Sequence, residues 1–388
     1  MTSQPMMPGQ GVPGPPAPPP GPPAPAQPAP PPSADEQTRQ YYCASCGAPL
    51  RYAPGSTVLR CESCGAERQI AAVGQLAPKD PYDQWASQAV AVDTIPPSQL
   101  RCRGCGAPTA SAALAQPCPF CGSGMVAEDN PAGLVGPKAL VPFVIDKKAS
   151  GDAFNDWVGS RWFAPSALKK VSSTEGLAGW YLPHWDFDAH TDTRYVGERG
   201  VHYWVTEGSG QNAHQVMRTA WTPVSGHLAR AFDDVLAPAA VNAGIPPKRL
   251  EHAGPWEIAS AVPYQPDFLA GYTAPRYDVN PDGGLQEAET KMRSAIEADC
   301  RASIGGDEQR LLRVDINYSA VLFRLILLPL WLASYLYAGK TYHVFVNANT
   351  GHVVGDRPYS RMKITLAVIG ALVVIAAIVA AVVLTRRH

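Results

Sequence analysis

Eight of the nine cysteines form four C-x-x-C pairs, arranged in two matched sets. Zinc(II) takes four thiolates at tetrahedral corners, and two residues between cysteines let one tight turn aim both sulfurs at a single ion. Residues 47–60 and 106–117 separate the pairs within each set, which is enough for a short hairpin. We therefore predict two four-cysteine zinc ribbons that bind two Zn²⁺ ions. The predicted ligands are Cys43, Cys46, Cys61 and Cys64 in the first ribbon, and Cys102, Cys105, Cys118 and Cys121 in the second.

Glycine follows the second cysteine of every pair. Glycine adopts a positive φ without steric cost, which lets backbone amides turn toward the sulfurs. The alternatives are disulfides or a redox-active C-x-x-C motif. Both are less favoured, because no βαβ pattern surrounds the pairs and the N-terminus carries no secretory signal. Reduced thiols of this kind indicate a cytosolic environment.

The two ends of the chain differ from the rest. Residues 1–38 are rich in proline and poor in bulky apolar side chains, which predicts a disordered tail of polyproline II character. The run from Ile364 to Leu384 carries no charge and, at about 1.5 Å per residue, matches the ~30 Å hydrocarbon layer of a membrane. We therefore expect residues 361–388 to be a single-pass C-terminal anchor in the cell membrane. Without an export signal, the bulk of the chain is expected on the cytoplasmic side.

The predicted fold class is multi-domain: two small zinc ribbons, a β-rich α+β domain and one transmembrane helix. Several strand-like segments begin with proline, which a strand tolerates at its start. In two other segments apolar residues recur every three or four positions, which predicts helices. The expected domains between the two ends are ribbon 1 at 39–72, a linker at 73–98, ribbon 2 at 99–128 and the β-rich domain at 129–360. The expected helices are 81–92, one capped by Ser150 or Asp152, and 285–303; a buried β-hairpin is expected from 325 onward.

The segment His184-Trp-Asp-Phe-Asp-Ala-His190 is the best candidate for catalysis. Side chains alternate along a strand, so His184, Asp186, Asp188 and His190 would share one face. That face could bind a metal or perform acid–base chemistry. The alternative, which we favour, is an amphipathic strand with its polar side in water and its aromatic side in the core.

Charge argues against a large nucleic-acid surface. The chain has 32 basic and 33 acidic residues, and neither ribbon carries a strong excess of cations. Phosphate binding normally needs several clustered cations. The triplet Gly339-Lys340-Thr341 lacks the preceding glycine and the following helix of a nucleotide-binding phosphate loop, so it predicts no nucleotide site.

Longer motifs follow the ribbons: GWYLPHWDFDA at 179–189, YVGERG at 195–200, FDDVLAPA at 232–239, IGGDEQR at 304–310, and LPLW followed by GKTYHVFVNANTGHVVGDRPYS within 328–360. With the CxxCG pairs, they resemble a family of bacterial membrane-anchored proteins with paired zinc ribbons. These are usually described as transcription-factor-IIB-type zinc-ribbon proteins or as primosomal-protein-N′-like. The resemblance implies no established catalytic activity, and it implies an association with membrane-stress systems. His184 departs from it, since an apolar or aromatic residue is more usual there.

Three functional hypotheses follow. The first is a non-enzymatic, membrane-tethered adaptor or scaffold that binds protein partners at the cytoplasmic face of the membrane, including other membrane or membrane-stress proteins. The second is a nucleic-acid-binding regulator that uses its ribbons. The third is a metal-dependent enzyme that uses residues 184–190. Weak local basicity and the missing catalytic motifs favour the first.

Overall fold

The computed structural model describes residues 38–39, 41–71, 74–88, 98–102, 105, 107–111, 113–127, 133–160, 176–242, 247–337, 340–355 and 361–385. The predicted disordered tail lies outside these residues, apart from Thr38.

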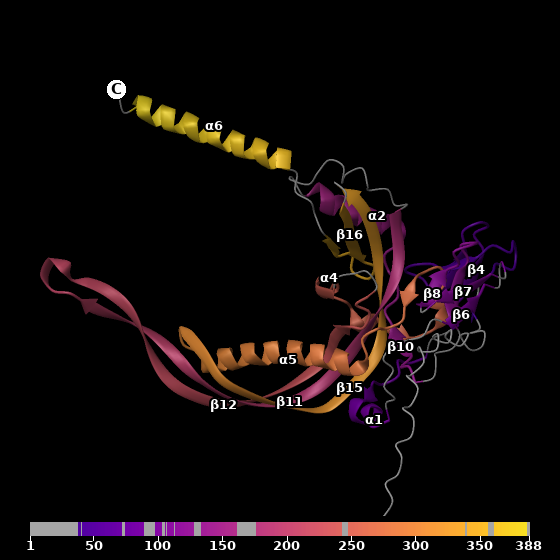
Figure 1. The fold of residues 1–388 in the computed structure, drawn as a ribbon, viewed down its shortest axis with the longest axis horizontal. Helices are drawn as coiled ribbons and strands as arrows, with labels where there is room; N and C mark the ends of the chain where they lie inside the picture. Colours follow the sequence, from indigo (N-terminus) through magenta and orange to yellow (C-terminus); the bar gives the residue numbers. More distant parts are fainter. Residues whose placement is uncertain are drawn as a thin grey trace, which may run out of the picture.

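Three very long strands dominate the molecule (Figure 1). They are β11 (Leu177–Glu207), β12 (His214–Pro238) and β15 (Glu308–Tyr337). The sheet order is β12-β11-β15-β10-β13, and β5, β16 and β17 join on the β15 side. A 31-residue strand is about 100 Å long at its usual rise. The shorter members are β5 (Asp80–Pro81), β10 (Pro137–Leu140), β13 (Val262–Pro263), β16 (Lys340–Asn347) and β17 (Val353–Gly355).

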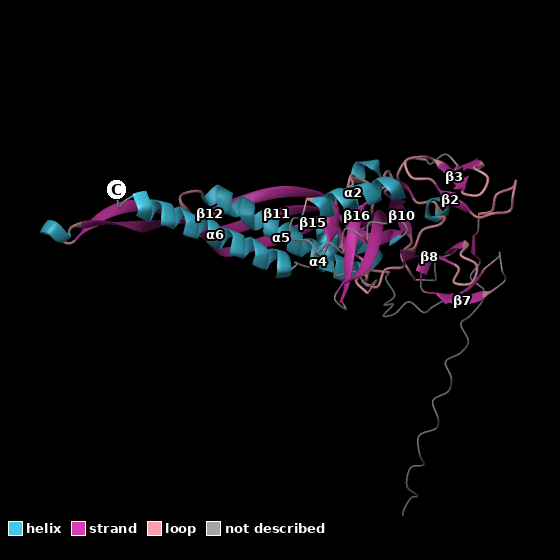
Figure 2. Ribbon diagram, turned by 90° about the horizontal axis from the view of Figure 1, so that it is seen from above, coloured by secondary structure: helices cyan, strands magenta, loops and turns pink. Residues whose placement is uncertain are grey.

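The long strands curve away from the body as an arm, whose far end is the β11–β12 hairpin alone (Figure 1). β15 begins opposite Gly200, so the hairpin beyond that residue has no third strand among the described residues. The short helix η2 (Gly210–Asn212) closes its tip. Seen from above, the molecule is elongated, with the strands of the two ribbons at the end opposite the hairpin tip (Figure 2).

Helix α5 (Pro281–Ile304) lies along the concave face of the three strands (Figure 1). The Asn280 side chain caps it by accepting a hydrogen bond from the Gly283 N–H, and Gly305 ends it in a left-handed conformation. Its buried side chains recur every four residues, as expected for one apolar stripe. They are Ala288, Met292, Ile296, Cys300 and Ile304. The predicted helix at 285–303 therefore forms, and Cys300 is a core thiol.

The central sheet is amphipathic only along its arm. From residue 189 to 195 of β11, every second side chain is buried under α5 and the intervening ones are exposed. Over residues 181–187 every side chain is buried, because other segments cover both faces. At this point the register shifts on both sides of β11, where Asp234 and Ala320 adopt positive φ values of 54° and 49°. The expectation that His184 and Asp186 face water is therefore wrong.

The two cysteine-bearing regions are small antiparallel sheets. Ribbon 1 has the order β2-β3-β4, with β2 (Leu50–Tyr52), β3 (Val58–Cys61) and β4 (Glu67–Gln69). Ribbon 2 contains the pair β6 (Ser98–Arg101) and β7 (Pro108–Ser111), followed by β8 (Ala113–Pro117) and β9 (Gly124–Ala127). The sheet of β8 and β9 is shared with β1 (Thr38–Arg39) and with β14 (Ala274–Pro275) of the body.

The remaining helices are short and belong to the body. The helix expected at 81–92 is the shorter helix α1 (Tyr82–Ala86). The rings of its Tyr82 and Trp85 pack edge-on against Phe323 of the central sheet. Helix α2 (Lys147–Gly159) begins before the expected caps, because Asp146 accepts a hydrogen bond from the Ala149 N–H. The others are α4 (Pro247–His252), η3 (Ile258–Ser260) and η4 (Pro266–Leu269).

The chain ends in helix α6 (Arg361–Thr385), where the membrane anchor was predicted. Of the helices in the described part of the chain, none is both long and apolar enough to cross a membrane. This finding contradicts the transmembrane helix predicted at 361–388 and the cell-membrane location that rested on it.

Trp185 tests the packing of α5 on the sheet. Its ring is fully buried, its Nε1 donates to the Val279 carbonyl at 2.8 Å, and a methyl group on Gly284 would lie 2.3 Å from its ring. We expect Trp185→Ala to lower the free energy of unfolding by about 3–5 kcal/mol in urea titrations. Val196→Ala, an exposed site on the same strand, should change it by no more than about 0.5 kcal/mol. Equal effects would contradict the assignment of the two faces.

Candidate metal centres and a buried charge network

The eight predicted cysteines lie in two groups of four, and within each group the Sγ atoms are all within 4.8 Å of one another. Within the groups, the two sulfur atoms are 3.5 Å apart for Cys43–Cys64, Cys46–Cys61 and Cys102–Cys121, and 3.8 Å apart for Cys105–Cys118. Four sulfurs at a Zn–S distance of about 2.3 Å would be about 3.8 Å apart on a tetrahedron. All nine cysteines of the chain are free of disulfides. Each group could hold a metal ion.

The three C-x-x-C turns that the structure describes in full fold back on themselves in the same way. The N–H of the glycine bonds to the carbonyl of the first cysteine at 2.9 Å for Gly47, Gly65 and Gly122. All three glycines have φ between 71° and 74°, which agrees with the reason given for glycine at these positions. The turn therefore depends on a backbone conformation that other residues rarely adopt.

Backbone amides also stabilise the thiolate form of the sulfurs. The N–H groups of Ser45 and Cys46 lower the pKa of Cys43 to about 6. The N–H of Ala66 acts to lower the pKa of Cys64, but the other three sulfurs of the group outweigh it and raise this pKa to about 12. Four sulfurs this close cannot all ionise without a cation between them. The donor set fits a soft divalent ion that supplies that charge.

Ribbon 1 is fixed to the body by hydrogen bonds and aromatic packing. The Tyr52 N–H donates to the Ala270 carbonyl at 3.0 Å, and the Gly55 N–H donates to the Phe143 carbonyl at 2.7 Å. The Tyr52 ring meets Phe268 edge-on, with centroids 5.0 Å apart. Residues of ribbon 1 and of the body thus belong to one continuous apolar core. The ribbon is not a separately tethered module.

A third group of potential ligands lies where the register of the central sheet shifts. Carboxylate oxygens of Asp186, Asp188 and Asp234 are within 4.8 Å of one another. The Lys79 ammonium lies between them, with Nζ 2.7 Å from Asp186 and 2.8 Å from Asp234 and a further bond to Asp188. Arg324 Nε donates to the second oxygen of Asp186 at 2.7 Å. The aspartates are thus bound by two cations of the chain itself.

Burial sets the electrostatics of this network. It raises the pKa of Asp186, and the charges of Lys79 and Arg324, which act to lower it, offset only part of the effect. Desolvation acts to lower the pKa of Lys79, but the surrounding carboxylates outweigh it and the pKa is raised. Three carboxylates against two cations leave the cluster with about one negative charge. Buried ions are tolerated when they are paired in this way.

His184 is buried beside this network. Its Nδ1 lies 3.2 Å from the Leu182 carbonyl oxygen, an acceptor, which assigns the ring proton to Nδ1. Burial lowers its pKa to about 4, with the positive charge of Lys291 acting in the same direction. The ring is therefore neutral at physiological pH. His190, at the end of the candidate strand, is exposed and lies outside the cluster.

Residue types and spacing identified the cysteines, but they did not identify Lys79 or Arg324. Lys79 lies in the predicted linker and Arg324 next to an apolar run, far from Asp186 in sequence. The available signal was a single arginine within the apolar run 320–333 of β15, since a cation there needs an acidic partner. Nothing in the sequence pointed to Lys79.

Comparisons with known proteins extend over most of the chain. The uncharacterized protein YdjG of Bacillus subtilis (strain 168) is 26% identical over 331 residues, which make up 84% of this chain and 91% of that relative. No family model matches the chain. No solved structure matches it. The description of the relative names no activity.

Asp186→Asn tests the buried ion pairs. Removing this charge leaves Arg324 and Lys79 without the most deeply buried of their carboxylate partners, and breaking a buried pair typically costs about 3–5 kcal/mol. We expect a loss of this size in urea unfolding. Asp192→Asn, which removes an exposed ion pair with His227 on the same strand, should cost no more than about 1 kcal/mol. A loss of about 1 kcal/mol or less for Asp186→Asn would show that the network is solvated.

His184 gives a pH dependence of defined sign. Its folded pKa of about 4 lies below its ordinary 6.5, so the unfolded state binds more protons between these values. The stability that the neutral ring contributes is present above about pH 6.5 and is lost as the pH falls toward 4. We expect the stability difference between wild type and His184→Gln to shrink by about 2 kcal/mol from about pH 7.5 to about pH 5. A pH-independent difference would contradict the burial of the ring.

Proposed function

We propose that the protein is a zinc-ribbon scaffold that binds protein partners and has no catalytic role of its own. The observation that carries this proposal is the pair of complete four-cysteine groups. Zinc sites with four protein ligands are structural, whereas catalytic sites keep one position open for water or substrate. Zinc at these centres would close the C-x-x-C turns and hold both small sheets against the body.

The arm supports the binding of partners. Among the described residues, β12 pairs only with β11, so its outer edge presents unpaired backbone groups. An open edge can accept an extended segment of another protein as an additional strand. Near the tip, Trp204 and Met217 face each other across the hairpin with exposed fractions of 65% and 50%. Exposed large side chains of this kind are typical of interaction surfaces.

The same structure argues against the other two hypotheses, a nucleic-acid-binding regulator and a metal-dependent enzyme. Three of the four arginines of ribbon 1 are paired with acidic groups: Arg51 with Glu62, Arg60 with Glu67 and Arg68 with Asp267. A surface neutralised in this way offers little to nucleic-acid phosphates. The aspartates that an enzyme would need for a metal are already held by Lys79 and Arg324. A metal there would have to displace a buried ammonium group.

The zinc content provides the first test. Metal analysis of the full-length protein should find two zinc ions per chain, because each centre has its own four thiolates. Cys43→Ser should remove one ion and leave the second, since the two groups share no ligand. Structural zinc contributes on the order of 10–16 kcal/mol to folding in zinc-finger peptides, so this variant should also destabilise ribbon 1. Loss of both ions together would contradict two independent centres.

The scaffold role is tested by crosslinking and affinity capture from the native cell. Wild-type protein should recover a defined set of proteins, and Trp204→Ser with Met217→Ser should lose at least part of it. Asp315→Ser, an exposed site on the same sheet, serves as the matched control. In parallel, duplex DNA should bind no better than the roughly 10⁻⁴ to 10⁻⁶ M of non-specific binders. Salt-sensitive binding of DNA below this range would favour the regulator hypothesis instead.

A further inference from the structure

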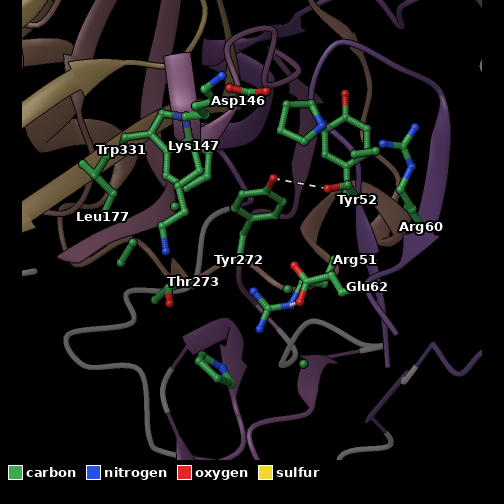
Figure 3. Close-up of a pocket in the computed structure, with 18 of the residues that line it drawn as sticks. Arg51, Tyr52, Arg60, Glu62, Asp146, Lys147, Leu177, Tyr272, Thr273 and Trp331 are labelled. Carbon is green, nitrogen blue, oxygen red and sulfur yellow. Dashed lines mark hydrogen bonds and ion pairs between the residues drawn. The ribbon is translucent and has the colours of Figure 1, made fainter. Parts of the chain in front are cut away.

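A cavity of about 460 Å³ lies where both ribbons meet the body (Figure 3). Ribbon 1 lines it with residues of β2 and β3, ribbon 2 with the turn around Gly122, and the body with the starts of α2 and β11. Cavities of about 300–1,000 Å³ are the usual size for small organic ligands. The cavity is separate from the eight sulfurs and from the buried charge network.

Aromatic side chains form its apolar wall, and they are held in place before any ligand binds. The Tyr272 hydroxyl donates to the Tyr52 carbonyl at 3.2 Å, and Trp331 Nε1 donates to the Ile145 carbonyl at 2.8 Å. The Tyr272 ring stacks on Phe143 with centroids 4.3 Å apart. Both wall residues are at least nine-tenths buried. A planar apolar group would therefore meet a preformed surface.

The charged residues around the cavity have an excess of cations. Four basic side chains and two acidic ones line it: Arg51, Arg60, Lys147, Lys148, Glu62 and Asp146. Lys147 and Lys148 form no hydrogen bond or ion pair with the described residues. Arg51 pairs with Glu62 and Arg60 with Glu67, so the two lysines stand against the single carboxylate of Asp146, which caps α2 and keeps its charge.

The unpaired charge is therefore positive, and it lies beside the aromatic wall. Lys147 lies on the same side of the cavity as Thr273, whose side chain also lines it (Figure 3). An ammonium group attracts an anion, and a nearby hydroxyl can donate to the same oxygen atoms. The apolar wall thus favours a planar apolar group, and the unpaired lysines favour an anionic group on the same ligand.

We propose that this cavity binds a small organic anion in which a carboxylate or phosphate is attached to a planar apolar group. The ring would lie against Tyr272 and Trp331, and the anion would contact Lys147 and Lys148. Aromatic carboxylates and mononucleotides share this chemistry. The proposal goes beyond the scaffold function and does not rest on it, because it depends on how the ribbons pack and not on their partners.

Calorimetric titration of the full-length, zinc-loaded protein tests the proposal with four probes: AMP, naphthalene-2-carboxylate, adenosine and inorganic phosphate. AMP, the carboxylate or both should bind at least about tenfold more tightly than adenosine and phosphate, since one charged hydrogen bond is worth about that factor. AMP alone would identify a phosphate ligand, and the aromatic acid alone a carboxylate. No binding by either, or adenosine or phosphate binding equally well, would overturn the proposal.

Variants then locate the site. Lys147→Gln should weaken binding about tenfold, because it removes an exposed, unpaired charge without touching the core. Ala178→Trp, which places an indole in the cavity, should abolish binding. Arg313→Gln, an exposed cation on β15, is the matched control and should change nothing. Unchanged binding by Ala178→Trp, or an equal loss with Arg313→Gln, would place the anion elsewhere and overturn the assignment. Zinc content and melting temperature verify that each variant is folded.

Discussion

The rest of the structure depends on one constraint: both faces of the central sheet are buried over residues 181–187. Helix α5 covers one face at Trp185, and on the other face Lys79 lies on Asp186 while Leu250 and Ala253 pack with Leu182. A strand with alternating polar residues cannot be buried on both sides unless its charges are paired. The two register shifts and the left-handed backbone of Asp234 bring the carboxylates onto one ammonium. Beyond residue 188 no described segment covers the polar face of β11, and its side chains are exposed again.

The ribbons obey a related constraint. A sheet of three short strands is too small to bury a core of its own, so it needs a metal, a neighbour or both. Ribbon 1 has a neighbour and a complete set of ligands for a metal. Its four cysteine sulfurs are close enough to share one ion, while Tyr52 and Leu59 complete the core of the body. Ribbon 2 joins the body through backbone pairing, because β14 extends its sheet. The cavity between the ribbons and α2 results from this arrangement, since three small surfaces rarely close without a gap.

The sequence predicted what depends on local spacing. The C-x-x-C pairs identified the eight sulfurs, and the period of apolar residues identified helix α5. It did not predict what depends on pairing between distant residues. Asp186 looks like a surface residue because its neighbours alternate, and its burial depends on pairing with Lys79 and Arg324, each more than a hundred residues away. The C-terminal anchor was predicted from the length and lack of charge of residues 364–384, and this prediction is wrong. The cavity was not predicted, because no single segment contributes more than a small part of its wall.

The contacts of ribbon 1 also constrain the order in which the chain can fold. Tyr41 bonds to Asp267 and Tyr272 bonds to Tyr52, across separations of 226 and 220 residues. During synthesis at about 5–20 residues per second, ribbon 1 therefore leaves the ribosome many seconds before its neighbours exist. In that interval the ribbon has no body to pack against, and a bound ion would be its main source of stability. Metal supply during translation would then control how much of the protein reaches its final fold.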